Sequence, residues 1–198
     1  MKKTYFILML TFLILVPTIF GAHSTKLLAV RQTKSGVEGS VADLTLELQQ
    51  GKGRVFIQTF PLTKLDTQIS TRFAKEIACE LAEEDCSRYD FIYTIRSDSS
   101  IVGGPSAGAA IAVLTVSRLK NLEIDHDTAI TGTINSGNLI GPVGHIRQKI
   151  EAAYNNGLNK VLIPQGKRHS IINASSNQTV DLVEYGNELG IQVKEVSD

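Results

Sequence analysis

The sequence lacks the features that identify several common classes of protein. Its 20 basic and 20 acidic residues leave no formal net charge, so nothing suggests nucleic-acid binding. No spacing of cysteine and histidine resembles a zinc site. No Gly-Lys-Ser or Gly-Lys-Thr follows a glycine-rich loop, so the usual phosphate grip of nucleotide hydrolases is missing. We therefore expect no metal, no cofactor and no nucleic-acid partner.

Cysteine is scarce as well, with Cys79 and Cys86 as the two copies. They lie seven residues apart in a stretch that is predicted to be helical. An unbroken helix would hold their Cα atoms about 10 Å apart, too far for a disulfide. A helix that ended near Glu84 would let Cys86 fold back. A disulfide and two buried thiols are both open interpretations.

The first 22 residues differ in composition from the rest. Lys2 and Lys3 precede an apolar stretch that runs from Tyr5 to Phe20. This pattern predicts a membrane anchor or a signal peptide over residues 1–22. Cleavage after Ala22 would place bulky Phe20 third from the cut, so we favour an uncleaved anchor. With the lysines in the cytoplasm, the single pass leaves the remaining chain extracytoplasmic; secretion after cleavage is the alternative.

Beyond this segment, strand signals come first and alternating helices and strands follow. Leucines alternate with polar residues over 44–48, and the glycine turn at 51–53 precedes residues 54–60. We interpret 54–60 as the return strand of a hairpin. Residues 66–84 carry apolar residues at 69, 73, 77 and 81, the spacing of one face of an amphipathic helix. The mixture predicts an α+β domain with a mixed sheet.

The most informative stretch surrounds Ser106, in the run Gly103-Gly104-Pro105-Ser106-Ala107-Gly108. Pro105 suits the first turn of a helix, and residues 105–119 are apolar enough for a buried one. Ser106 would then lie beside backbone N–H groups that have no partner within the helix. Such groups can hold the negative oxygen that forms when a carbonyl is attacked. A tightly packed turn with a capping serine is the alternative interpretation.

Lys149 is the candidate base for this serine. It borders an apolar face formed by Ile146, Ile150 and Ala153 in a predicted helix. Burial lowers the pKa of a lysine, and a neutral amine can accept a proton from a serine hydroxyl. A lysine whose stem covers apolar surface while its ammonium reaches water is the alternative. His145 provides a second candidate base, in a Ser106–His145 pair.

Together these residues resemble the proteolytic domain of the Lon protease family, over residues 27–197. The separation from Ser106 to Lys149 is that of the family's serine and lysine. Gly103, Thr133 and His145 depart from common family residues. The segments that carry the resemblance are Gly104-Pro105-Ser106-Ala107-Gly108, Thr131-Gly132-Thr133-Ile134, Gly141-Pro142-Val143-Gly144, Ala152-Ala153 and Val161-Leu162-Ile163-Pro164.

The resemblance implies a Lon-type α+β fold and a serine peptidase that acts on polypeptides. It implies Ser106 as nucleophile, Lys149 as general base and Thr131 as the residue that orients the lysine. Backbone groups of Gly104, Ser106 and Ala107 would contact the substrate and form the oxyanion hole.

The resemblance also sets expectations for the whole molecule. A chain of 198 residues has no room for the family's ATPase domain, which implies a small, membrane-anchored, ATP-independent peptidase. A homo-oligomeric ring is a further expectation from the family. The rival hypotheses are a catalytically silent peptide-binding scaffold and a proteolytic subunit that works with a separate ATPase.

Overall fold

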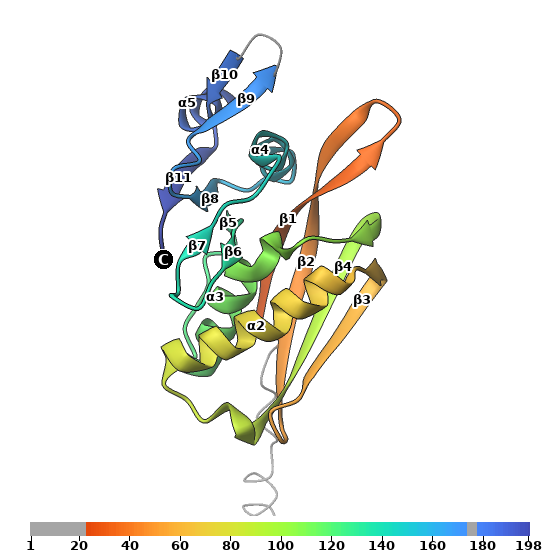
Figure 1. Cartoon of the computed structure of the whole chain (residues 1–198), viewed down its shortest axis with the longest axis vertical. Coiled ribbons are helices and arrows are strands. Elements are labelled where there is room, and N and C mark those ends of the chain that lie inside the picture. Colours follow the sequence, from red (N-terminus) through yellow and green to blue (C-terminus); the bar gives the residue numbers. More distant parts are fainter. Residues whose placement is uncertain (1–22, 174–177) are drawn as a thin grey trace, which may run out of the picture.

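A seven-stranded mixed sheet forms the centre of the molecule (Figure 1). The computed structural model describes residues 23–173 and 178–198. The strands follow the order β11-β8-β5-β1-β2-β4-β3, with β1 antiparallel to β2 and parallel to β5. The sheet strands are β1 (His23–Thr33), β2 (Gly36–Gln50), β3 (Val55–Thr63), β4 (Tyr89–Val102), β5 (Thr128–Ile130), β8 (Lys160–Pro164) and β11 (Gln192–Val196).

Helices and two short two-stranded sheets complete the fold. The α-helices are α2 (Leu65–Ala82), α3 (Gly108–Lys120), α4 (Ile146–Asn155) and α5 (Leu182–Leu189). The 3-10 turns are η1 (Cys86–Arg88) and η2 (Pro105–Ala107). The small sheets pair β6 (Thr133–Ile134) with β7 (Ile140–Gly141), and β9 (His169–Asn173) with β10 (Gln178–Asp181). This mixture of sheet and helix confirms the predicted α+β class.

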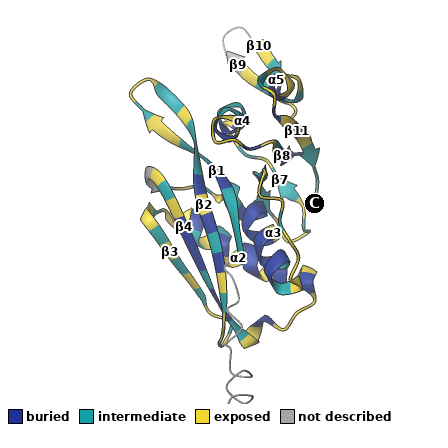
Figure 2. Ribbon diagram, turned by 180° about the vertical axis from the view of Figure 1, so that it is seen from behind, coloured by how far each residue is buried: buried dark blue, intermediate teal, exposed yellow. Residues whose placement is uncertain are grey.

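Two hydrophobic cores lie on opposite faces of the large sheet. Successive residues of a strand point to opposite faces, and the neighbours Leu27 and Leu28 of β1 belong to different clusters. The Leu27 cluster packs against α2 and α3, and the Leu28 cluster against α4 and α5. Figure 2 shows how largely α3 is buried. The sheet therefore separates the helix that follows Ser106 from the helix that carries Lys149.

The predicted hairpin between β2 and residues 54–60 is wrong. β4 lies between β2 and β3, antiparallel to the first and parallel to the second. The glycine turn closes around the start of β4 instead, where the Asp90 carboxylate accepts hydrogen bonds from Lys52 N at 2.8 Å and Arg54 N at 3.0 Å. The Arg54 guanidinium pairs with the same carboxylate. These long-range contacts fit the position of β4 between β2 and β3.

The predicted helix over 66–84 exists as α2, but of its apolar stripe only Ile77 is buried. Ile69 is 60% exposed and Leu81 48% exposed. The buried side carries small residues beside Ile77, among them Thr71, Ala74 and Ala78. Small side chains on α2 and α3 let the two helices approach closely, which explains why the bulkier Ile69, Phe73 and Leu81 point outward.

The end of α2 decides the state of the cysteines. Glu83 adopts a left-handed conformation that terminates the helix, and the chain then turns back. Cys79 and Cys86 come to a Cα separation of 6.0 Å and form a disulfide. The interpretation in which Cys86 folds back is therefore the correct one.

The prediction of a membrane anchor or signal peptide concerns residues 1–22, which lie outside the described residues. Within 23–173 and 178–198, no helix has the length and apolar character that a membrane crossing requires.

Candidate active site

Ser106 lies in the 3-10 turn η2, immediately before α3. Gly104 begins this turn at φ 104°, a backbone conformation that side chains disfavour. The Ser106 carbonyl accepts a hydrogen bond from Gly132 N at 3.0 Å, and the Gly132 carbonyl accepts one from Ala109 N at 3.0 Å. This reciprocal pair fixes the serine turn to the segment that follows β5. The Ser106 side chain is half-buried, so a ligand can reach it.

Lys149 comes from the opposite face of the sheet, on α4. This helix packs so closely on β2 that a Cβ at Gly39 would lie 1.9 Å from the Gln148 carbonyl oxygen. Glycine at this position therefore allows α4 to reach the sheet. Lys149 is 2% exposed. Burial lowers the pKa of its amine to about 8, because a charged ammonium loses hydration there.

Thr131 connects the two residues at the end of β5. Lys149 Nζ donates a hydrogen bond to Thr131 Oγ1 at 2.9 Å. The Thr131 hydroxyl lies 3.5 Å from the Ser106 carbonyl oxygen, to which it donates. Thr131 is completely buried, and its N–H donates to the Leu162 carbonyl at 3.0 Å. The fixed Thr131 hydroxyl therefore holds the Lys149 amine in one position.

Ser106 and Lys149 line the same cavity, which has a volume of about 310 Å³. The structure thus brings together the serine and lysine that the sequence singled out, at the point where the end of β5 meets both helix layers. His145 also lines this cavity and occupies the N-cap of α4 at φ 56°. The remaining residues that line the cavity are Ala29, Val30, Gly103, Gly104, Pro105, Thr133, Pro142, Val143 and Gly144.

One of the expected oxyanion donors is already engaged. Gly104 N donates to Asp66 Oδ1 at 3.1 Å, so this N–H is not available to an oxyanion while that bond holds. Gly108 N and Ala109 N donate to the carbonyls of Pro105 and Gly132. Of the three residues expected to form the oxyanion hole, Gly104 and Ser106 line the cavity. Ala107 packs against the Leu27 cluster.

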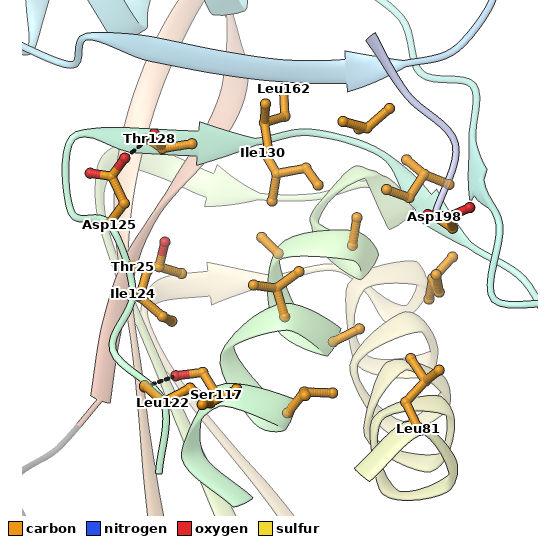
Figure 3. A pocket seen from close by; sticks show the side chains of 18 of the residues that line it. Thr25, Leu81, Ser117, Leu122, Ile124, Asp125, Thr128, Ile130, Leu162 and Asp198 are labelled. Carbon is orange, nitrogen blue, oxygen red and sulfur yellow. Dashed lines mark hydrogen bonds between the residues drawn. The ribbon is translucent and has the colours of Figure 1, made fainter. Parts of the chain in front are cut away.

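A second cavity of about 470 Å³ lies beside α3 and has a different character (Figure 3). Apolar residues such as Val113, Ile130 and Leu162 form most of its lining, which includes neither Ser106 nor Lys149. The β6–β7 hairpin separates the two cavities, with Thr133 on the serine side and Ile134 on the apolar side. The smaller cavity is the candidate active site because it contains the reactive groups.

Several residues that shape the site escaped the sequence reasoning. Gly39 carried no signal, because its importance depends on the packing of α4, which lies more than 100 residues later in the chain. Asp66 could be recognised only as an acidic residue in the first turn of a helix. Ala29 and Val30 of β1 looked like ordinary strand residues, although they line the cavity.

Comparisons with known proteins identify the family of the chain. Residues 78–185, more than half of the chain, match the Lon protease (S16) C-terminal proteolytic domain. A Lon protease of Syntrophomonas wolfei is 31% identical over 136 residues, covering 67% of this chain and 16% of that protein. An archaeal Lon protease of Thermococcus kodakarensis is 35% identical over 88 residues, covering 44% of this chain and 14% of that protein. An archaeal Lon protease of Thermoplasma acidophilum is 31% identical over 136 residues, covering 67% of this chain and 20% of that protein.

The fold and the matched segment together define a peptidase domain. The chain belongs to the Lon protease family and corresponds to its proteolytic domain, as the resemblance in the sequence predicted. It spans only about a fifth or less of the length of these relatives.

Proposed function

We propose that this chain is a serine endopeptidase that uses Ser106 as nucleophile and Lys149 as general base. The observation that carries the proposal is the buried amine of Lys149, which shares a cavity with Ser106. A serine hydroxyl needs a base within reach, and a lysine serves only in its neutral form. A pKa of about 8 makes the neutral form accessible near physiological pH.

The proposed reaction proceeds through an acyl-enzyme. The neutral Lys149 amine accepts the Ser106 proton while Oγ attacks the peptide carbonyl carbon, and backbone N–H groups around Ser106 stabilise the oxyanion. The Lys149 ammonium then protonates the leaving nitrogen as the C–N bond breaks. Water gives a proton to Lys149 and attacks the acyl carbon, which releases the acid and returns the proton to Ser106. Thr131 keeps the amine in position throughout.

Covalent labelling tests the nucleophile. A fluorophosphonate should modify wild-type protein at Ser106, and Ser106→Ala should neither be labelled nor hydrolyse an unfolded polypeptide. Folding of Ser106→Ala is checked by its circular dichroism spectrum and melting temperature. Complete resistance of the wild-type protein to labelling across pH 6 to 10 would favour the rival hypothesis of a peptide-binding scaffold.

We further propose that the domain acts outside the cytoplasm on unfolded or flexible proteins, without ATP. The Cys79–Cys86 disulfide supports this location, because disulfides persist mainly in oxidising compartments. Membrane fractionation of the full chain tests the anchor at residues 1–22, and recovery of a shortened secreted form would indicate a cleaved signal peptide. Hydrolysis measured with and without ATP distinguishes a stand-alone enzyme from a subunit that needs an ATPase.

The homo-oligomeric ring stays a proposal from the family alone. Sedimentation velocity of the purified domain tests it directly, and a single monomeric species at all concentrations would contradict it.

A further inference from the structure

The first turn of α2 binds both peptide groups of Gly104, two residues before the serine. Asp66 Oδ1 accepts a hydrogen bond from Gly104 N at 3.1 Å. The Thr67 hydroxyl lies 3.3 Å from the Gly104 carbonyl oxygen and 3.4 Å from Asp66 Oδ1, within reach of either acceptor. Thr67 is 1% exposed, so its hydroxyl has little access to water. Two adjacent residues of one helix therefore hold a single glycine.

This contact is important because Gly104 has an unusual conformation. Its φ of 104° and ψ of 150° are readily accessible only to glycine, and a glycine is also the residue with the most alternative conformations. Fixing the backbone of one residue costs conformational entropy. Hydrogen bonds from a helix that is itself packed against α3 offset this cost locally.

The Ser106 turn is thus held from two sides. After the serine, the reciprocal bonds with Gly132 tie the turn to the end of β5. Before the serine, α2 holds Gly104. If the second attachment were lost, the chain could rotate at Gly104 and Pro105, and the direction of the Ser106 hydroxyl would change while the rest of the fold stayed intact.

We propose that Asp66 and Thr67 are positioning residues for the nucleophile. They hold the Gly104 backbone so that the Ser106 hydroxyl and the following N–H groups face the cavity, and they keep the Gly104 N–H away from the oxyanion. The assignment rests on the proposed function of Ser106. Asp66 acts through its acceptor atom and not through its charge.

The experiment compares Asp66→Ala with Asp66→Asn. The alanine variant should lose about 10- to 100-fold in kcat with little change in KM, because misplacement of a reacting group affects mainly the chemical step. The asparagine variant retains an acceptor oxygen and should recover most of kcat. The midpoint of the pH–rate profile should be the same in both variants and in wild type, because the base is unchanged.

A matched control removes a similar carboxylate elsewhere. Asp85 Oδ1 accepts a hydrogen bond from Ser87 N at 3.1 Å, at the start of η1. Asp85→Ala should leave kcat unchanged, even where it lowers the melting temperature. Thr67→Val supplies a second variant with nearly the same side-chain volume, and it should reduce kcat less than Asp66→Ala.

Hydrogen exchange at the Gly104 amide gives a readout that does not depend on catalysis. In the Ser106→Ala background, Asp66→Ala should speed exchange at this amide by at least about tenfold, whereas Asp66→Asn and Asp85→Ala should not. Unchanged exchange, wild-type kcat in Asp66→Ala, or an asparagine variant as inactive as the alanine variant would each overturn the assignment. If Asp66→Ala speeds exchange as expected but the wild-type protein never hydrolyses peptides, the proposed function is wrong and the contact between α2 and Gly104 stands.

Discussion

At the scale of single residues, the site depends on an amine that is removed from water. Burial of Lys149 is the cause of its lowered pKa, and its hydrogen bond goes to the neutral hydroxyl of Thr131. A neutral acceptor orients the amine without restoring the preference for the charged form that a carboxylate would bring. The same burial that suits a general base also makes the lysine costly for the fold.

The first prediction concerns the pH dependence of hydrolysis. Activity on a fluorogenic peptide should rise with pH as Lys149 loses its proton, with a midpoint near 8. Lys149→Arg should lose about 10²- to 10⁴-fold in kcat, because a guanidinium stays protonated and cannot act as a base. His145→Ala should retain much of the activity. An inactive His145→Ala beside an active Lys149→Ala would establish the Ser106–His145 pair instead.

The second prediction concerns stability. The pKa of Lys149 is lower in the folded chain than the usual 10.5, so the unfolded chain binds more protons between about pH 8 and 10.5. Stability should therefore rise with pH across this window. Lys149→Met should be inactive and yet more stable than wild type at pH 7, by roughly 1–3 kcal/mol.

Urea unfolding at pH 7 and at pH 11 tests this expectation, because the advantage should vanish once the wild-type lysine is neutral in both states. Exposed Lys194 provides the control, and Lys194→Met should leave stability nearly unchanged. A less stable Lys149→Met at pH 7 would show that the hydrogen bond to Thr131 outweighs the cost of burial.

At the scale of elements, the strands depend on contacts that are distant in sequence. Asp90 at the start of β4 receives the backbone N–H groups of Lys52 and Arg54, and the Arg54 guanidinium beside it holds its pKa well below the usual range. A carboxyl with a depressed pKa stabilises the fold at pH values above about 4, and this contribution is lost as the pH falls below that value.

The third prediction follows from this junction. Asp90→Asn keeps an acceptor for the two N–H groups but loses the pairing with Arg54, so the midpoint of urea unfolding at pH 7 should fall. The difference from wild type should shrink as the pH falls below about 4, because the unfolded wild-type chain then binds a proton at this carboxyl more readily than the folded chain does. Asp43→Asn, which alters an exposed pair with Lys26, should change the midpoint little. Equal effects of the two variants would contradict the role of Asp90.

The elements also show what sequence reasoning could predict. The helix after Ser106 and the helix of Lys149 were predictable because local composition determines them, and the family motifs aligned the two residues. The pairing of β3 was not predictable, because a glycine turn suggests a hairpin until the contacts of Asp90 are known. Most of the buried side of α2 was also missed, since close packing against α3 favours threonine and alanine over the larger Ile69 and Leu81.

At the scale of the whole molecule, β1 is the strand that joins the two parts of the sheet. It pairs with β2 along its whole length and with β5 through Leu27 and Ile130. The fourth prediction is that a chain beginning at His23 folds and is soluble, whereas a chain beginning at Gly36 does not fold. Circular dichroism and thermal melting of the two chains check this, and a cooperative melt of the shorter chain would contradict it.

The two cores on opposite faces of the sheet have a consequence for how heat would affect the activity of the domain. The serine turn packs with the Leu27 cluster through Ala107, whereas Lys149 lies between Ile146 and Ile150 of the Leu28 cluster. Ser106 and Lys149 therefore rest on different hydrophobic clusters, and Thr131 at the end of β5 connects them. A small shift between the two clusters, without exposure of either one to water, would already separate Ser106 from Lys149. We therefore expect mild heating to abolish hydrolysis below the melting temperature, and cooling to restore it.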